Sequence, residues 1–235
     1  MPDFMVLIHE NEASSTGLTP RETRALLDSQ AAYEQKLRAT AAYRDGERLR
    51  PSAEGRRVSR RDGERRIEKG PFADPTLSGY YVLQAANLEA ALELAEQCPS
   101  SPGAELEVRP LMKGHLEHDK TGQQGRVFAF GVLGSAANER AWIDIMDRID
   151  ERTHDHFPAE RFRGGVRLEA PGRGRRVSSS GGRRAVFDGP FLETKEVIGG
   201  LFFMRMATLD EAVEWASQSE FVKLGSLEIR ELWRS

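Results

Sequence analysis

The sequence has little cysteine, little net charge and no long hydrophobic run. Cys98 is the single cysteine among 235 residues, which excludes an internal disulfide and a zinc site built on several thiolates. The formal net charge is −3, so the overall charge does not attract nucleic acid or membranes. No stretch approaches the roughly 20 apolar residues that cross a bilayer. The first residues lack the basic start and long apolar core of a signal peptide, so we expect a cytoplasmic protein.

The same order of sequence signals occurs twice in the chain. Pro190 follows Pro71 by 119 residues (190 − 71), and Arg230 follows Arg109 by 121 (230 − 109). One two-residue gap beside a Gly-Pro-Phe turn explains the change of spacing. A register this regular indicates a tandem duplication.

Each repeat predicts the order strand, helix, hairpin, strand, helix, strand. In the first repeat these are a strand at 4–9, a helix that starts with a Thr19-Pro20-Glu22 capping box and runs to about 42, a hairpin at 56–67 turning at Asp62-Gly63, a strand at 79–83, a helix capped by Asn87 and a strand at 106–111. In the second they are a strand at 127–133, a helix at 137–157, a hairpin turning at Gly181-Gly182, a strand at 201–204, a helix at 210–217 and a strand at 227–232. We interpret Arg44-Asp45-Gly46 as the end of the first helix.

This order indicates an α+β fold in which two helices cover one face of each sheet. We expect domains at 1–112 and 126–235, joined by a polar linker at 113–125. Stacking of the two uncovered sheet faces would give an internal pseudo-dimer with one continuous core. Further oligomerisation stays open.

A resemblance to a known family lies in the stretch 188–200, DGPFLETKEVIGG, with a looser copy at 69–79, KGPFADPTLSG. With the flanking hairpin, helix and strand, it resembles the signature of the DGPF proteins of the YCII-related family. The resemblance covers both halves and implies tandem ferredoxin-like (βαββαβ) repeats forming an intramolecular dimeric α/β barrel in a bacterial cytoplasmic protein. For the wider family it implies a His/Asp active-site pair. A few relatives act as lyases on ring compounds, and some are encoded beside alternative sigma factors.

The candidate site combines the end of the first strand with the Gly-Pro-Phe turn of the second repeat. His9 is the candidate proton acceptor, and Asp188 or Glu193 is its partner or the second acid/base group. Lys195 is the candidate anion anchor, and Gly189-Pro190-Phe191 shapes the substrate site. Because only the second repeat keeps this charged signature, we expect its pocket to work and the first repeat to be mainly scaffold.

Each candidate also has a structural interpretation. His9 would then only hydrogen-bond the backbone, and the acidic and basic residues after Asp188 would form solvated surface ion pairs. Gly189-Pro190-Phe191 would be a turn whose aromatic ring anchors it in the core. His154-Asp155-His156 and the histidines of the linker, His115 and His118, are weak metal signals, so we expect neither a metal nor a cofactor.

The preferred function is a small-molecule-binding protein, acting as a cofactor-independent lyase or isomerase. The alternative is a regulatory or interaction protein without turnover that uses its basic hairpins or a sheet edge. The basic strings are Arg56, Arg57, Arg60, Arg61, Arg65 and Arg66 in the first repeat, and Arg173, Arg175, Arg176, Arg183 and Arg184 in the second. They lack interleaved aromatic residues for stacking bases, so nucleic acid is not an expected partner.

Overall fold

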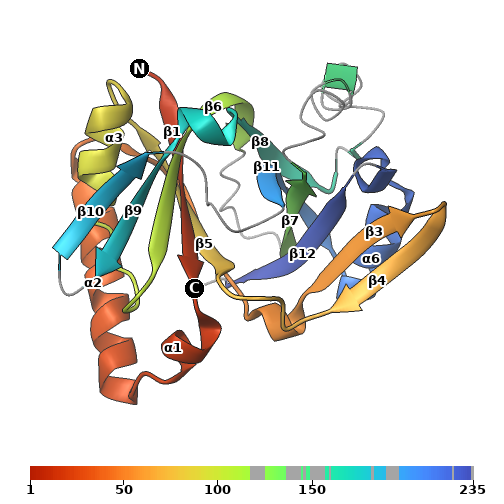
Figure 1. The fold of residues 1–235 in the computed structure, drawn as a ribbon, viewed down its shortest axis with the longest axis horizontal. Coiled ribbons are helices and arrows are strands. Elements are labelled where there is room, and N and C mark those ends of the chain that lie inside the picture. Colours follow the sequence, from red (N-terminus) through yellow and green to blue (C-terminus); the bar gives the residue numbers. More distant parts are fainter. Residues whose placement is uncertain are drawn as a thin grey trace. The chain divides into compact units, whose positions relative to one another are not determined.

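The computed structural model describes residues 1–116, 125–135, 144, 147–148, 157–158, 160–180, 183–188, 196–223 and 225–233 (Figure 1). The chain forms two compact units, each assembled from three segments. Unit 1 comprises Met1–Arg48, Ala73–Met112 and Leu168–Leu192, and unit 2 comprises Leu49–Phe72, Lys113–Arg167 and Glu193–Ser235. Each unit therefore draws on both sequence repeats.

Unit 1 is an antiparallel sheet with helices on one side. Its elements are β1 (Asp3–Glu10), α1 (Glu12–Thr16), α2 (Pro20–Ala39), β2 (Tyr43–Leu49), β5 (Thr76–Gln84), α3 (Leu88–Ala95), β6 (Glu105–Leu116), β9 (Arg175–Ser180) and β10 (Arg183–Asp188). The strand order is β2-β5-β1-β6-β9-β10, with every adjacent pair antiparallel. The first four strands, with α2 and α3, form the ferredoxin-like arrangement.

Unit 2 repeats this plan. Its elements are β3 (Arg56–Arg61), β4 (Glu64–Lys69), β7 (Arg126–Gly134), β8 (Phe162–Leu168), β11 (Val197–Met206), α6 (Leu209–Gln218) and β12 (Ser226–Trp233). The strand order is β8-β11-β7-β12-β3-β4, again antiparallel throughout. Strand for strand, this order matches unit 1, so the two units are structural equivalents.

The hairpins of the two repeats are exchanged between the units. Hairpin β3–β4 comes from the first repeat and pairs with β12, as the orange and blue strands of Figure 1 show. Hairpin β9–β10 comes from the second repeat and pairs with β6. Val58 of β3 lies in the core of unit 2, and Val177 of β9 lies in the core of unit 1. Each hydrophobic core therefore needs a residue from the other repeat.

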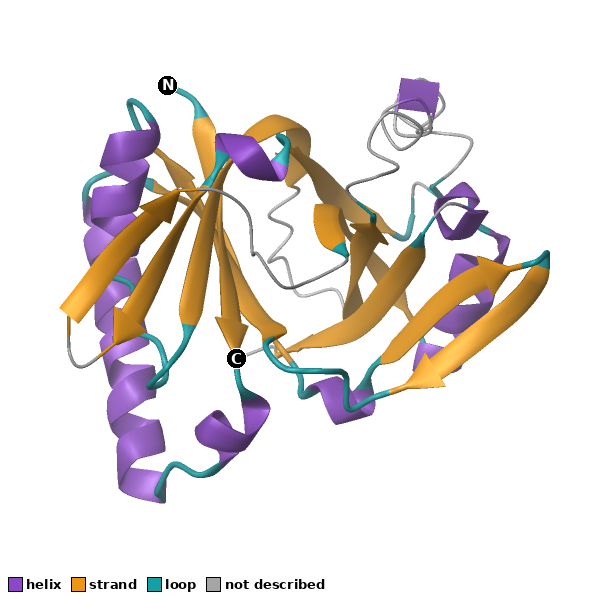
Figure 2. Ribbon diagram, in the orientation of Figure 1, coloured by secondary structure: helices purple, strands orange, loops and turns teal. Residues whose placement is uncertain are grey.

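Each unit has its own hydrophobic core between the sheet and its helices. In unit 1, Tyr33 and Leu37 of α2 and Ala91 of α3 pack on Val6 and Leu106. Figure 2 shows α2, the longest purple helix, running beside the strands of this unit. In unit 2, Ala212, Val213 and Ala216 of α6 pack on an aromatic cluster that includes Phe130 and Phe202, whose stacked rings are 4.8 Å apart. A core continuous between the units stays a prediction.

The local start and turn signals are confirmed. Thr19 and Glu22 form the capping box of α2, and Asn87 accepts the backbone N–H of Ala90 at the start of α3. At the hairpin turn, Asp62 and Gly63 have φ angles of 54° and 82°, as a tight turn requires. The α+β class with tandem ferredoxin-like repeats, the fold type of dimeric α/β barrels, is confirmed.

The interpretation of Arg44-Asp45-Gly46 as a helix end was wrong. Helix α2 ends at Ala39, and these three residues lie inside strand β2, whose equivalent in unit 2 is β8. In β2, Asp45 is buried, and a Cβ added at Gly46 would lie 2.4 Å from the Tyr81 ring, so glycine permits close strand packing. The Asp-Gly pair therefore serves a strand and makes no turn.

The predicted linker and the predicted helix at 137–157 lie partly outside the residues that the structure describes. Strand β6 continues to Leu116, four residues into the predicted linker at 113–125, of which 117–124 lie outside the described residues. The helix expected at 137–157 also lies largely outside them, although Asp144, Asp147 and Arg148 are helical. The domain limits 1–112 and 126–235 stay a prediction about repeats, since the compact units interleave in sequence.

Candidate functional site

The candidate site lies on the face of the unit 1 sheet opposite its helices. Side chains alternate along a strand, and Phe4, Val6 and Ile8 of β1 belong to the helix-side core. His9 therefore lies on the other face. Pairing of β1 with β6 sets His9 opposite Glu105 and Leu7 opposite Glu107. We call this surface, which carries His9, Asp45, Tyr80, Glu107 and Arg109, the polar face.

His9 and Glu107 form the central pair of the polar face. Nε2 of His9 lies 3.7 Å from Oε2 of Glu107, and the other oxygen, Oε1, lies 3.5 Å from Nη1 of Arg109. The three residues are 9%, 6% and 1% exposed. Burying a charged side chain costs free energy unless the charge is paired, so the ion pair with Arg109 is needed to keep Glu107 in this position.

The environment keeps Glu107 ionised. Burial by itself would raise the pKa of the Glu107 carboxyl, but the adjacent His9 imidazole and the charge of Arg109 outweigh it and hold the pKa below its ordinary value. A carboxylate beside an imidazole orients the ring and stabilises its protonated form. The pair can therefore accept a proton at His9.

Arg109 supports this pair and is itself fixed by the backbone. Its Nε donates to the carbonyl of Glu169 at 3.0 Å, and its Nη2 donates to the same oxygen. A Cβ added at Gly174 would lie 2.6 Å from Cγ of Arg109, so glycine is required where the chain crosses the arginine. Arg109 is therefore a positioning residue for Glu107.

The polar face carries a second polar pair, on strands β5 and β2. The Tyr80 hydroxyl on β5 donates to Oδ2 of Asp45 on β2 at 2.9 Å. Burial and the neighbouring Asp45 raise the pKa of Tyr80 well above its ordinary value. Tyr80 therefore stays protonated at neutral pH and acts as a hydrogen-bond donor.

The equivalent face of unit 2 also has an arginine that is fixed by a backbone carbonyl and paired with a glutamate. We call this arrangement the anchor. Arg230 donates to the carbonyl of Arg50 at 2.8 Å and lies 3.1 Å from Glu228, as Arg109 does with Glu169 and Glu107. The second partner of Glu228 is Arg57, at 2.9 Å.

Apolar residues occupy the other equivalent positions. The strand registers match His9 with Leu133, Tyr80 with Leu201, Glu47 with Val166 and Asp45 with Gly164. The polar groups that accompany the anchor are thus specific to unit 1.

Of the predicted site residues, the structure describes His9 and the backbone of Asp188. Asp188 ends β10, where it pairs with Arg175, and Arg175 pairs with Val108. Three strand spacings separate β10 from β1, about 14 Å. Glu193, Lys195 and Gly189-Pro190-Phe191 lie outside the described residues. The carboxylate found beside His9 is Glu107, and the role of Asp188 stays a prediction.

Sequence reasoning missed Glu107, Arg109, Asp45 and Tyr80. The alternation of apolar and polar residues in Leu106-Glu107-Val108-Arg109 is typical of a half-buried strand, but it does not show what the polar side chains contact. The signal available was repetition, because Glu107 and Arg109 recur 121 residues later (228 − 107, 230 − 109).

The first-repeat copy of the Gly-Pro-Phe turn supports its structural interpretation. Phe72 is 6% exposed, its N–H donates to Oγ of Ser52, and Arg57 lies over its ring at 4.7 Å. The Phe72 ring therefore anchors the turn of the first repeat, and the role of Gly189-Pro190-Phe191 stays a prediction.

Several arginines of the basic strings have internal partners. Arg57 binds Glu196 and Glu228, Arg65 binds Glu214, and Arg176 binds Glu105. These contacts link each hairpin to other elements of its unit. The candidate metal residues His118, His154 and His156 lie outside the described residues, as does the side chain of His115.

Comparison with known proteins now decides the family. The model of the YCII-related domain matches twice, at residues 3–114 and 100–235. The chain belongs to the YCII-related family. As a tandem member of that family, it carries one match for each repeat. No curated protein matches.

Two solved structures are similar over nearly their whole length. One is named "Putative Chlorite dismutase" (11% identity, TM-score 0.43, 100% of this chain and 96% of that one). The other is named "Putative monooxygenase", from Fusobacterium nucleatum subsp. nucleatum (12% identity, TM-score 0.42, 98% and 91%). At these values neither likeness bears on function. Among the described helices, none has the length and hydropathy to cross a membrane.

Proposed function

We propose that this YCII-related protein binds a small polar or aromatic metabolite at the polar face of unit 1 and transfers a proton there. The reaction class is a cofactor-independent isomerisation or elimination that begins with removal of a proton beside a carbonyl or carboxylate. His9 accepts the proton, and the Glu107 carboxylate orients the imidazole and stabilises its protonated form.

The observation that carries this proposal is the buried His9–Glu107 pair, at 3.7 Å, on a face that is apolar at the same position of unit 2. A purely structural role would explain the anchor formed by Glu107 and Arg109, because unit 2 has it too. It would not explain why an imidazole replaces the leucine found at position 133. The proposal assigns the working site to unit 1, whereas the charged signature had favoured the second repeat.

The test is solvent deuterium exchange. The full chain is incubated in D₂O with panels of keto acids, hydroxy acids and aromatic carboxylates, and NMR measures deuterium incorporation beside the carbonyl group. We expect incorporation into at least one compound and its loss in His9→Leu, which copies unit 2. Leu133→Met is the matched control at the equivalent position and should retain exchange.

Thermal-shift measurements separate binding from turnover. A compound that exchanges should stabilise the wild-type chain and Leu133→Met. Asp188→Asn tests whether that carboxylate is the second acid/base group, in which case stabilisation persists while exchange is lost. Exchange that continues in His9→Leu, or a panel without either response, would overturn the proposal.

A further inference from the structure

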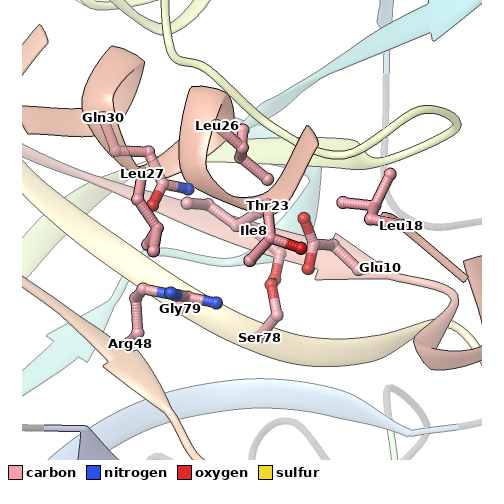
Figure 3. A pocket seen from close by; sticks show the side chains of 10 residues that line it. All are labelled: Ile8, Glu10, Leu18, Thr23, Leu26, Leu27, Gln30, Arg48, Ser78 and Gly79. Atoms are coloured by element: carbon pink, nitrogen blue, oxygen red, sulfur yellow. The ribbon is translucent and has the colours of Figure 1, made fainter. Parts of the chain in front are cut away.

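Unit 1 has a cavity on the helix side of its sheet, away from the polar face. The cavity has a volume of about 60 Å³ and lies between α2 and the ends of β1, β2 and β5. Figure 3 shows Thr23, Leu27 and Gln30 of α2 on one side, with Glu10 and Arg48 on strands opposite. A water molecule needs about 10–15 Å³ by this measure, so the cavity admits a ligand of roughly four to six non-hydrogen atoms.

The cavity wall carries two opposite charges held by different strands. Oε1 of Glu10 accepts hydrogen bonds from the N–H and hydroxyl of Ser101, at 3.2 and 2.8 Å, which fix the carboxylate in place. Arg48 is exposed, and its guanidinium has no hydrogen bond or ion pair with any residue in the described part of the chain. One wall group is thus anchored, and the other has hydrogen-bond donors available.

The second repeat shows what an arginine at this position binds. Arg48 of β2 pairs with Gly79 of β5, and Arg167 of β8 pairs with Gly200 of β11, so the two arginines are equivalent. Nη1 of Arg167 binds Oδ1 of Asp147, in the helical segment of unit 2, at 2.7 Å. Unit 2 therefore supplies a carboxylate from its own helix.

The described residues of α2 that line the cavity offer Arg48 no such carboxylate. The polar side chains that α2 contributes to the cavity are the neutral Thr23 and Gln30. Thr23 already donates to the carbonyl of Thr19, and Gln30 donates to that of Pro99. A bound carboxylate would therefore complete at Arg48 the pair that Asp147 completes at Arg167.

We propose that this cavity binds a small zwitterionic amino acid of the size of glycine or alanine. The ligand carboxylate binds Arg48, and its ammonium group binds Glu10. Charge-assisted hydrogen bonds to both ends select a zwitterion over a simple acid or amine. The apolar Leu26 and Leu27 favour a ligand with a short side chain or none. This inference does not depend on the proposed function at His9.

The experiment is NMR titration of the ¹⁵N-labelled full chain with glycine, alanine, acetate and methylamine. We expect glycine or alanine to shift the amide signals of Glu10, Arg48 and Gly79 in a saturable way. Acetate and methylamine should bind at least about tenfold more weakly, since each lacks one charged contact. Arg48→Gln and Glu10→Gln should each weaken glycine binding by a similar factor.

Two controls separate a specific site from general effects. Arg24→Gln removes an arginine of α2 that pairs with Asp28 and does not line the cavity, and it should leave the titration unchanged. His9→Leu should also leave it unchanged, which distinguishes this site from the polar face. The proposal is overturned if no amino acid binds, if Arg48→Gln binds glycine as the wild type does, or if acetate binds equally well.

Discussion

The two units share one scaffold and differ in what surrounds its buried arginine. Arg109 and Arg230 each donate to a backbone carbonyl and pair with a glutamate on the same strand. Around this anchor, unit 1 has histidine, tyrosine and aspartate where unit 2 has leucine and glycine. Repeated features therefore describe the architecture, and the unrepeated ones are the positions on which the proposed function depends.

The same comparison applies to the helix side. Arg167 is neutralised by Asp147, whereas its equivalent Arg48 faces a cavity. In both places, unit 1 presents polar groups that unit 2 either lacks or pairs internally. Duplication allows this divergence because one copy can maintain the fold while the other changes.

The largest effect should come from removing the shared anchor. Arg109→Met leaves the buried Glu107 without its arginine, and Arg230→Met leaves the half-buried Glu228 with Arg57 alone. Each variant also leaves a loop carbonyl without its donor. We expect Arg109→Met to lower the free energy of unfolding by about 3–5 kcal/mol, and Arg230→Met to lower it by less, measured by urea denaturation. A loss below 1 kcal/mol in either variant would contradict the anchor role. If either variant fails to fold, Arg109→Lys or Arg230→Lys should be less damaging.

Glu107→Gln should show a pH dependence that follows from its lowered pKa. The folded-state pKa lies below the unfolded value, so the carboxylate stabilises the fold above the unfolded pKa, near 4.5. This contribution is lost as the pH falls through the folded pKa. We expect Glu107→Gln to cost about 2–3 kcal/mol at pH 7 and progressively less below pH 4.5.

Urea denaturation of the wild type and Glu107→Gln at several pH values checks this expectation. A stability difference that stays constant from pH 7 to pH 3 would show that the ionised carboxylate is not responsible.

The hairpin exchange predicts which unit responds to a core cavity. Val58→Ala, in the first repeat, should loosen unit 2, and Val177→Ala, in the second, should loosen unit 1, each at a cost of about 2 kcal/mol. Hydrogen exchange should show faster exchange in β7 and β12 for the first variant and in β1 and β6 for the second. Faster hydrogen exchange in the opposite unit for either variant would show that the hairpins are not exchanged between the units.

The smallest effect concerns the helix caps, where the two units use different residues at equivalent positions. Asn87 caps α3 and Thr208 caps α6, each accepting a backbone N–H. Asn87→Ala and Thr208→Ala should each cost about 1 kcal/mol in thermal or urea unfolding. Equal losses would show that asparagine and threonine cap the two helices equally well. No loss in one variant would show that the start of that helix is frayed and its cap contributes nothing.

Local chemistry made part of the fold predictable. The capping box at Thr19 and Glu22 and the Asp62-Gly63 turn depend on neighbours in sequence, so their signals survive without tertiary context. Strand β2 was missed because Asp45 and Gly46 favour a turn locally, and only burial against Tyr80 and Tyr81 makes them a strand. Glu107 was missed because alternation identifies two faces of a strand without showing which groups cover the polar one.

By itself, the sequence determined that the protein is a tandem repeat of an α+β module, since periodicity, caps and turn residues act over short range and repeat in register. Only the tertiary structure decided that the hairpins change units and that His9 lies beside Glu107. These are pairings between strands distant in sequence, and a strand carries no local mark of its partner. The burial and charge of the whole unit select which strands pair.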